Sequence, residues 1–245
     1  MWTYPRVVAH RGGGILAPEN TMAALRCAVA YGFHAVEFDV MAVRGDGLVL
    51  MHDPVRGRTV PGEGMIADFT LEELSSMDAG SWHSPPFCGE PVVSFADAAQ
   101  FCLAHDVWMN AEIKPVSGVE IRTGYLVAEA CKRLPVGRVL LSSFSVDALA
   151  AAQDVAPEVP RAWLVDAVPA DWESTLRRLG ASALHVNARC LTAAQALAVK
   201  GAGFGLFCYT VNEPVQARAL RAIGVDAICT DRLDLIGAHF FDQAA

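Results

Sequence analysis

The sequence predicts an α/β fold in which repeated strand–helix units close into a barrel, and two observations support this prediction. Short β-rich runs alternate with longer stretches of Ala, Leu and Val at helical spacing along the whole 245-residue chain. No linker interrupts this alternation, and the chain is long enough for one large core but too short for two ordinary domains. We therefore predict a single domain over residues 1–245.

Eight segments of the chain are rich in β-forming residues, and this number suits a closed barrel. The predicted strands are Arg6–His10, Ala35–Val40, Trp108–Lys114, Val139–Phe144, Arg161–Val165, Ala183–Asn187, Gly205–Val211 and Ala227–Thr230. Helices fit between them, for example at Thr21–Tyr31, Thr192–Lys200 and Glu213–Ile223. Thr21 and Thr192 stand where N-caps are expected.

One interval, residues 53–91, breaks the alternation after the second predicted strand. It is rich in Gly and Pro around a short helical segment at Leu71–Met77. We predict that it forms a small insertion over one end of the barrel. Because active sites of such barrels lie at the carboxyl ends of the strands, polar residues at those ends are the candidates for function.

Composition excludes several classes of protein. The net charge of −8 provides no basic surface for nucleic acid or an anionic membrane. The amino terminus lacks the pattern of a signal peptide, and no apolar run reaches the roughly 18 residues of a membrane span, so we predict a cytoplasmic protein with no stable membrane association. The seven scattered cysteines contain no CxxC pair and predict neither a zinc site nor a disulfide framework. The sequence leaves the oligomeric state open.

Two carboxylates lie in the apolar run AVEFDV. Glu37 and Asp39 are separated by one residue, so they point to the same face of the strand, roughly 6.6 Å apart along it. Two carboxylates inside a barrel must share a proton or bind a cation, and a hard divalent ion is the simplest partner. The alternative is a salt-bridged pair on an exposed face, and this strand alone does not distinguish the two.

A second strand favours the metal interpretation. Asn110, Glu112 and Lys114 alternate along Trp108–Lys114 and lie on one face, and Pro115 ends the strand. A third carboxylate and a cation are thus expected at the same rim. An isolated Glu/Lys pair is usually structural, whereas an inward pair at the carboxyl end of a barrel strand is typical of catalysis.

Two histidines also stand at strand ends. His10 and Arg11 close the first strand and precede a glycine run whose backbone can approach a ligand, and Arg11 offers a fork for phosphate oxygens. His52 ends the β-like run LVLMHD, where Asp53 can orient its ring or simply cap a turn. Together with the carboxylates and Lys114, these residue types suit phosphodiester hydrolysis: cations neutralise charge on phosphorus, and two imidazoles transfer protons.

Motifs along nearly the whole chain resemble those of the glycerophosphodiester phosphodiesterase family. The matching segments are AHRGGGILAPENT (Ala9–Thr21), VEFDV (Val36–Val40), VLMHDP (Val49–Pro54), GEGMIADFTLEEL (Gly62–Leu74), DAGSW (Asp78–Trp82), AEIKP (Ala111–Pro115), SSF (Ser142–Phe144), YTVN (Tyr209–Asn212) and GVDAICTD (Gly224–Asp231). The resemblance implies a TIM-type (β/α)8 barrel and hydrolysis of a small glycerophosphodiester to glycerol 3-phosphate and an alcohol. It leaves open whether water attacks directly or a glycerol hydroxyl first forms a cyclic phosphate.

The resemblance also implies a role for each candidate residue. It implies that His10 and His52 are the acid/base pair and that one divalent cation, Mg²⁺ or Ca²⁺, binds to Glu37, Asp39 and Glu112. It also implies that Arg11 and Lys114 bind phosphate and that Phe144 and Tyr209 form walls of the substrate cleft. Glu19 and Asn20 are expected to hold the first loop in an ordered conformation. The chain has Tyr209 where the family usually has Trp, and Val93–Phe95 where Pro-Thr-Leu is common. Both departures affect the expected substrate preference and leave the catalytic set intact.

Two other functions are alternatives to this interpretation. One is a phospholipase on the same barrel that acts at a membrane, which the acidic balance and the complete insertion motif disfavour. The other is a degenerate barrel that only binds, which should have lost catalytic residues. The remaining histidines, His34, His83, His105, His185 and His239, match no catalytic motif, although His83 lies in the insertion, where contact with a leaving group is an alternative to a purely structural role. Asp231 is expected to fix a loop rather than to bind metal.

Overall fold

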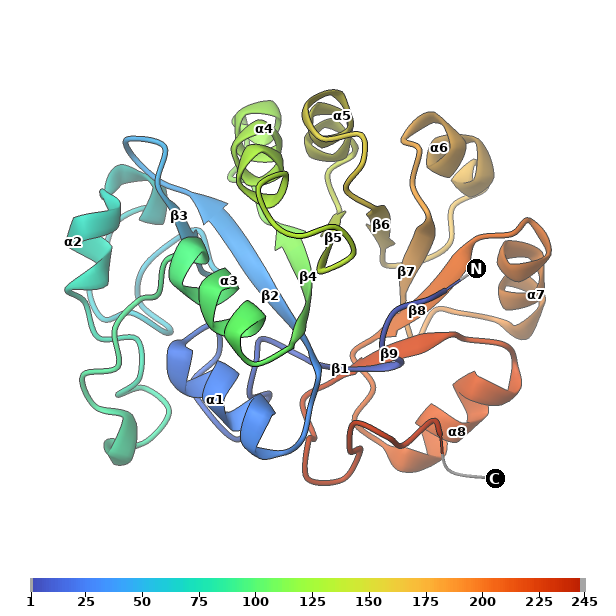
Figure 1. The fold of residues 1–245 in the computed structure, drawn as a ribbon, viewed down its shortest axis with the longest axis horizontal. Helices are drawn as coiled ribbons and strands as arrows, with labels where there is room; N and C mark the ends of the chain where they lie inside the picture. Colours follow the sequence, from blue (N-terminus) through green and yellow to red (C-terminus); the bar gives the residue numbers. More distant parts are fainter. Residues whose placement is uncertain (1, 243–245) are drawn as a thin grey trace.

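The computed structural model describes residues 2–242, and these contain eight parallel strands that close into a barrel (Figure 1). The strands are β1 (Val7–Ala9), β2 (Ala35–Ala42), β4 (Trp108–Ile113), β5 (Val139–Ser143), β6 (Arg161–Val165), β7 (Ala183–Asn187), β8 (Gly205–Tyr209) and β9 (Ala227–Thr230). Strand β1 pairs in parallel with both β9 and β2, which closes the sheet. The predicted TIM-type barrel is confirmed.

The strand bounds follow the prediction closely. Strands β6, β7 and β9 have the predicted bounds, β1, β4, β5 and β8 stop one or two residues earlier, and β2 runs two residues further. His10, Lys114 and Phe144 therefore lie just beyond the strand ends, on the rim of the barrel. The amides of His10 and Lys114 still donate to the carbonyls of Thr230 and Val40, at 2.9 and 3.0 Å, so these two residues remain attached to the neighbouring strands. The run around Val49 forms a short strand, β3 (Leu48–Leu50), which pairs antiparallel with the end of β2 outside the barrel.

Helices cover the outside of the barrel. They are α1 (Met22–Ala30), α3 (Phe95–Ala104), α4 (Glu120–Cys131), α5 (Val146–Val155), α6 (Trp172–Arg178), α7 (Ala193–Gly201) and α8 (Pro214–Ala222). The two predicted N-caps are confirmed: the Thr21 hydroxyl accepts from the Ala24 amide at 3.2 Å, and Thr192 forms a reciprocal capping box with Gln195. Such a cap stabilises a helix by about 1 kcal/mol.

An aromatic cluster fills the barrel at the amino ends of the strands. Tyr4 stacks on Trp108 with ring centroids 5.0 Å apart, and Trp2 packs against Phe207 at 5.8 Å. Small buried residues such as Ala35, Ala183 and Ala227 complete this layer. The segment before β1 thus closes one end of the barrel, and the polar residues gather at the other.

The segment between β3 and α3 has a small core of its own. It contains η1 (Ile66–Asp68), α2 (Leu71–Ser75) and η2 (Pro85–Phe87), and α2 lies beside β3 at the left of Figure 1. Helix α2 ends two residues earlier than predicted. The core of this segment consists of Met41, Val43, Val49, Met51, Val60, Ile66, Leu74, Ala79 and Val92. Because β2 and β3 supply part of this core, the segment is fixed to the barrel beside β2, the strand that carries Glu37 and Asp39.

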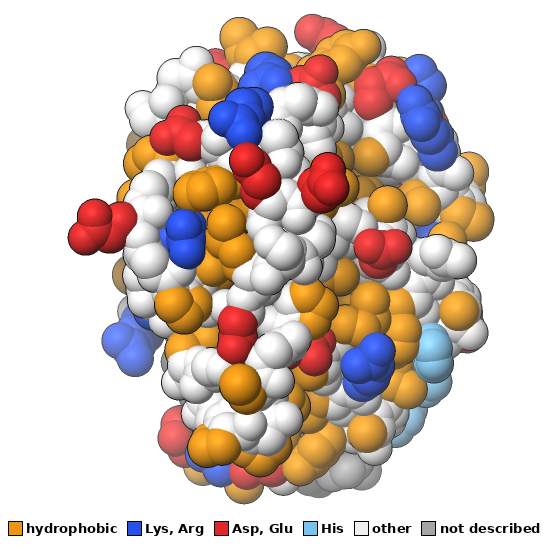
Figure 2. All heavy atoms as spheres, turned by 90° about the vertical axis from the view of Figure 1, so that its left-hand side faces the viewer, with side chains coloured by type: hydrophobic (Ala, Val, Ile, Leu, Met, Phe, Trp, Pro, Cys, Tyr) orange, Lys and Arg blue, Asp and Glu red, His pale blue; other side chains and the backbone are white. Residues whose placement is uncertain are grey.

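The surface carries mixed charge. On the face shown in Figure 2, acidic and basic side chains are interspersed, and no continuous basic area is visible among the coloured residues. Among residues 2–242, no helix has the length and hydropathy that crossing a bilayer requires.

Candidate active site

Strands β2 and β4 place three carboxylates in one cluster. The two strands pair in parallel with Glu37 opposite Asn110 and Asp39 opposite Glu112, so alternate residues of both point into the barrel. One oxygen from each of Glu37, Asp39 and Glu112 lies within 4.8 Å of the others, and all three side chains are buried. The structure therefore brings together the three residues predicted as metal ligands, in a geometry that can hold one ion.

The electrostatics of this cluster indicate a need for positive charge. Burial and the charge of Asp39 raise the pKa of Glu37 to about 7 and that of Glu112 to about 8. Burial also opposes ionisation of Asp39, but the charges of Lys114, Arg11 and His52 outweigh it and hold the pKa of this carboxyl below its usual value. Without another cation, the cluster would take up protons near neutral pH. Carboxylate oxygens in such a site suit a hard divalent cation.

Two cationic side chains border the cluster. Lys114 Nζ donates to Glu112 Oε1 at 2.9 Å and lies 3.3 Å from Asp39 Oδ1. Arg11 Nε lies 3.5 Å from Asp39 Oδ2. Burial lowers the pKa of both groups, but their acidic neighbours raise it further, so both remain charged.

The loop after β1 is fixed by side chains that the sequence motif contains. Asn20 donates to Asp39 Oδ2 at 2.8 Å and accepts from the Asp39 amide at 3.1 Å, while Glu19 accepts from the Arg11 guanidinium at 2.7 Å. Gly14 has a φ of +56°, and a Cβ there would lie 2.2 Å from the carbonyl oxygen of Asp231. At Gly14 the glycine run thus allows a close approach to the chain itself, and the approach to a ligand stays a prediction.

His10 forms a pair with a carboxylate from the far end of the chain. Its Nδ1 lies 2.5 Å from Asp231 Oδ1, and its Nε2 lies 3.8 Å from Glu37 Oε2. Asn212 fixes Asp231 from the other side, donating to Oδ2 at 2.9 Å and accepting from the Asp231 amide at 2.8 Å. Burial lowers the pKa of His10, but the hydrogen bond to Asp231 and the neighbouring carboxylates outweigh it, so the pKa is raised.

His52 forms the corresponding pair with its neighbour. Its Nδ1 lies 2.7 Å from Asp53 Oδ1, so Asp53 contacts the ring and does more than cap a turn. Burial lowers the pKa of His52, and the attraction of Asp39 does not fully offset this burial together with the repulsion of Arg11 and Lys114. The surroundings therefore shift the two histidines in opposite directions.

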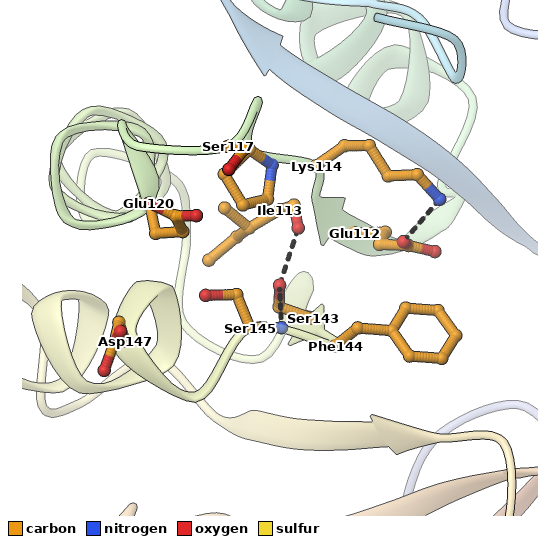
Figure 3. A pocket seen from close by; sticks show the side chains of 10 residues that line it. Glu112, Ile113, Lys114, Ser117, Glu120, Ser143, Phe144, Ser145 and Asp147 are labelled. Atoms are coloured by element: carbon orange, nitrogen blue, oxygen red, sulfur yellow. Dashed lines mark hydrogen bonds and ion pairs between the residues drawn. The ribbon is translucent and has the colours of Figure 1, made fainter.

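A pocket of about 470 Å³ opens on one side of the carboxylates. Its walls include Glu112, Lys114, Ser143 and Phe144, and Figure 3 shows the Phe144 ring beside Glu112 and Lys114. Lys114 Nζ is 5.9 Å from the centroid of the Phe144 ring. Tyr209 packs edge-on against Phe144 at 5.9 Å and donates its hydroxyl to the Val165 carbonyl at 3.0 Å.

A second pocket of about 330 Å³ lies on the other side, between the first loop and the insertion. Its walls are His10, Arg11, Gly14, Ile15, Glu19, Trp82, His83 and Asp231. A ring nitrogen of His83, Nε2, lies 3.0 Å from the Ile15 carbonyl oxygen. The insertion therefore forms part of the rim, as expected from its position.

Two contacts at this rim are not evident from the sequence. Asp231 is predicted from the sequence only to fix a loop, yet it contacts His10. The motif that contains Asp231 drew attention to this residue but did not predict its contact with His10. Arg58 of the insertion contacts both Glu19 and Asp53, and nothing in its Gly- and Pro-rich segment signalled this. Of the other histidines, His185 is fully buried inside the barrel, whereas His34, His105 and His239 are exposed.

Comparison with known proteins decides the family. Residues 10–235 match the model of the glycerophosphoryl diester phosphodiesterase family. The chain belongs to this family. A glycerophosphodiester phosphodiesterase of Caldanaerobacter subterraneus subsp. tengcongensis is 32% identical over 229 residues, which are 92% of this chain and 93% of the relative.

Solved structures agree with this family assignment. A phosphodiesterase of Oleispira antarctica, determined in complex with the product sn-glycerol-3-phosphate, has 33% identity and a TM-score of 0.92, covering 98% of this chain and 97% of its own. A glycerophosphodiester phosphodiesterase of Agrobacterium tumefaciens has 25% identity and a TM-score of 0.77, covering 94% and 98%. The predicted family and enzyme class are thereby confirmed.

Proposed function

We propose that this phosphodiesterase hydrolyses small glycerophosphodiesters to glycerol 3-phosphate and an alcohol, with one divalent cation. The observation that carries the proposal is the buried cluster of Glu37, Asp39 and Glu112, bordered by Lys114, Arg11 and two histidines at one rim. The product bound in the Oleispira antarctica structure supports the choice of substrate. We further propose that residues 1–245 act as one domain, with 53–91 as its insertion. A cytoplasmic location stays a prediction.

The three carboxylates fit a divalent cation. Their oxygens lie within 4.8 Å of one another, and burial makes three negative charges unfavourable without a counter-ion. A cation bound by Glu37, Asp39 and Glu112 would polarise the phosphoryl group and offset the charge that develops on it. Both Mg²⁺ and Ca²⁺ accept such oxygen donors.

Arg11 and Lys114 bind the phosphoryl oxygens in this proposal. Both are held charged beside the cluster, so they are positioned before the substrate arrives. The Arg11 fork can contact two oxygens, and Lys114 acts as a point charge. Such fixed groups stabilise the charge that develops in the transition state.

The two histidines divide the proton transfers. Asp231 and Asp53 hold Nδ1 of His10 and His52, which leaves Nε2 of each ring for transfer. The opposite pKa directions support His52 as the base, which removes a proton from the nucleophile, and His10 as the acid, which protonates the leaving alkoxide as the P–O bond breaks. Water or a glycerol hydroxyl can serve as nucleophile, and a cyclic phosphate formed by the latter would then be opened by water.

The two pockets support a substrate with two small alcohol groups. One pocket lies beside Phe144 and the other beside Trp82, and the proposed phosphate position lies between them. We propose that each takes one of the two alcohols esterified to phosphate. Tyr209 then contributes by supporting the Phe144 ring.

Product analysis on a panel of glycerophosphodiesters, with and without chelator, tests this function. We expect glycerol 3-phosphate and free alcohol only when metal is present. Preferential hydrolysis of phospholipid bilayers over glycerophosphocholine would instead favour the phospholipase hypothesis.

The division of roles between the histidines has its own test. His10→Ala should lose far less activity on a p-nitrophenyl ester, whose leaving group needs no proton, than on a choline ester. His52→Ala should be poor on both, and equal losses for both variants on both substrates would contradict the division of roles.

A further inference from the structure

One arginine of the insertion contacts two acidic residues at the rim. Arg58 Nε donates to Asp53 Oδ2 at 2.5 Å, and its two terminal nitrogens donate to the two oxygens of Glu19, each at 2.7 Å. All three donor positions of the guanidinium are therefore used. The contact with Glu19 is a bidentate fork of the kind that fixes orientation as well as charge.

Each of these acceptors also holds a group assigned to catalysis. The other oxygen of Asp53, Oδ1, lies 2.7 Å from Nδ1 of His52. Glu19 Oε1 also accepts from Arg11 at 2.7 Å. Arg58 is thus connected to His52 through Asp53 and to Arg11 through Glu19.

We propose that Arg58 is a positioning residue that fixes His52 and Arg11 relative to each other. This inference rests on the proposed function, because it assigns proton transfer to His52 and phosphate binding to Arg11. It gives the insertion a role in the reaction itself, since Arg58 belongs to the segment between β3 and α2. The insertion would thereby set the distance between the phosphate and the base.

Geometry, rather than charge alone, carries this role. The Arg58 side chain is 44% exposed, and an exposed ion pair stabilises a fold by only about 0–1 kcal/mol. A planar guanidinium donates from three nitrogens in a rigid fork, whereas an ammonium is a single point charge with rotatable donors and no fork. A displacement of about 1 Å in a catalytic group can cost on the order of 100-fold in rate. The effect of Arg58 should therefore be large on turnover and small on stability.

The Trp82 ring helps to hold the guanidinium in place. Its centroid lies 6.0 Å from the central carbon of Arg58, at the outer limit for a cation–π contact. Trp82 also lines the pocket that His10 and Arg11 border. The arginine is therefore bounded by the insertion on one side and by the first loop on the other.

The test compares Arg58→Met with Arg56→Met in the presence of Mg²⁺. Arg56 is a matched control because it lies in the same segment but contacts Pro61, Glu63 and Phe69. For Arg58→Met we expect kcat to fall by about 10- to 100-fold and the Kd for inorganic phosphate to rise several-fold, with little change in Tm. Arg56→Met should keep kcat and Kd. If the two variants have the same activity and phosphate affinity, the proposal is wrong.

Single-arm variants separate positioning from a general structural loss. Asp53→Asn should lower kcat with phosphate affinity kept, whereas Glu19→Gln should weaken phosphate binding and lower kcat by less than Asp53→Asn does, because Glu19 contacts Arg11 and not His52. Adding Arg58→Met to Asp53→Asn should then weaken phosphate binding and lower kcat no further than Glu19→Gln does by itself. A further 10-fold fall in kcat in the double variant would overturn the proposed coupling through Asp53.

A second Arg58 variant covers the case in which Arg58→Met fails to fold. Arg58→Lys keeps the charge but not the fork, so it should show both the fall in kcat and the rise in the Kd for phosphate that are expected of Arg58→Met. Wild-type values in Arg58→Lys would overturn the geometric role. The phosphate measurement does not depend on turnover. A wild-type chain that binds phosphate but hydrolyses no glycerophosphodiester would contradict the proposed function, while the effect of Arg58 on Arg11 would still be decided.

Discussion

A neutral histidine inside the barrel should make the fold sensitive to acid. His185 on β7 is fully buried and stacks on Phe207 with ring centroids 4.4 Å apart. Neither of its ring nitrogens has a hydrogen-bond partner among the described residues. Burial lowers the pKa of His185 from 6.5 to about 3, because its surroundings cannot solvate the imidazolium.

The sign and size of the effect follow from proton linkage. Below pH 6.5 His185 binds a proton in the unfolded chain but stays neutral in the folded chain. The free energy of unfolding therefore decreases as the pH falls from 6.5 towards 3. With about 1.4 kcal/mol for each unit of pKa difference, the full shift corresponds to roughly 5 kcal/mol. Between pH 7 and pH 5 the expected loss is about 2 kcal/mol.

Urea unfolding at pH 7 and pH 5, followed by circular dichroism, measures this loss. His185→Leu replaces the ring with an apolar side chain, so its free energy of unfolding should fall by about 2 kcal/mol less than that of the wild type over this range. His34→Leu, at an exposed position, removes a histidine without this burial and should fall as the wild type does. If His185→Leu and the wild type lose the same free energy, the assigned pKa is wrong. The comparison also separates acid unfolding from the titration of His10 and His52 in an activity profile.

Three further predictions concern the active site. Excess EDTA should abolish activity, and Mg²⁺ or Ca²⁺ should restore it; full activity in chelator would reject the metal site. Glu112→Gln should lose most of the metal-dependent turnover yet keep or raise Tm in chelator, because it removes a buried carboxyl whose pKa is raised to about 8; a clearly lower Tm would contradict this. Burial lowers the pKa of His10 and the Asp231 hydrogen bond raises it, so Asp231→Asn should move the alkaline limb of kcat to lower pH. An unchanged pH–rate profile would remove Asp231 from the proton transfer.

Local patterns predicted the barrel and the carboxylate cluster well. The alternation of Glu37 with Asp39, and of Glu112 with Lys114, is a property of any strand, so side-chain direction could be inferred before the strands were paired. The structure adds that β2 and β4 are neighbours in the sheet although residues 53–91 separate them along the chain. The predicted closed barrel implies that these two strands are neighbours, but no local pattern in the sequence does.

Contacts between distant segments could not be predicted. Asp231 meets His10 across 221 positions of sequence, and closure of the sheet through β1 and β9 brings them together. Arg58 lies in a segment without periodicity, where turns rather than a repeating pattern determine side-chain direction. The glycines of the first loop were recognised as permissive, but their contact with Asp231 depends on the same closure.

Pairing of β1 with β9 has a consequence for the order in which the enzyme can assemble. During synthesis β1, which directly precedes His10, emerges before the other strands of the barrel, whereas Ile228 and Thr230 of β9 and the carboxylate of Asp231 emerge after them. Loop closure over such distances is slow, so the earlier βα units must wait as an open sheet with an exposed edge. A nascent chain that stops before β9 would carry all three proposed metal ligands and both histidines, and still lack the partner of His10. Catalytic competence should therefore arise with the last strand rather than accumulate along the chain.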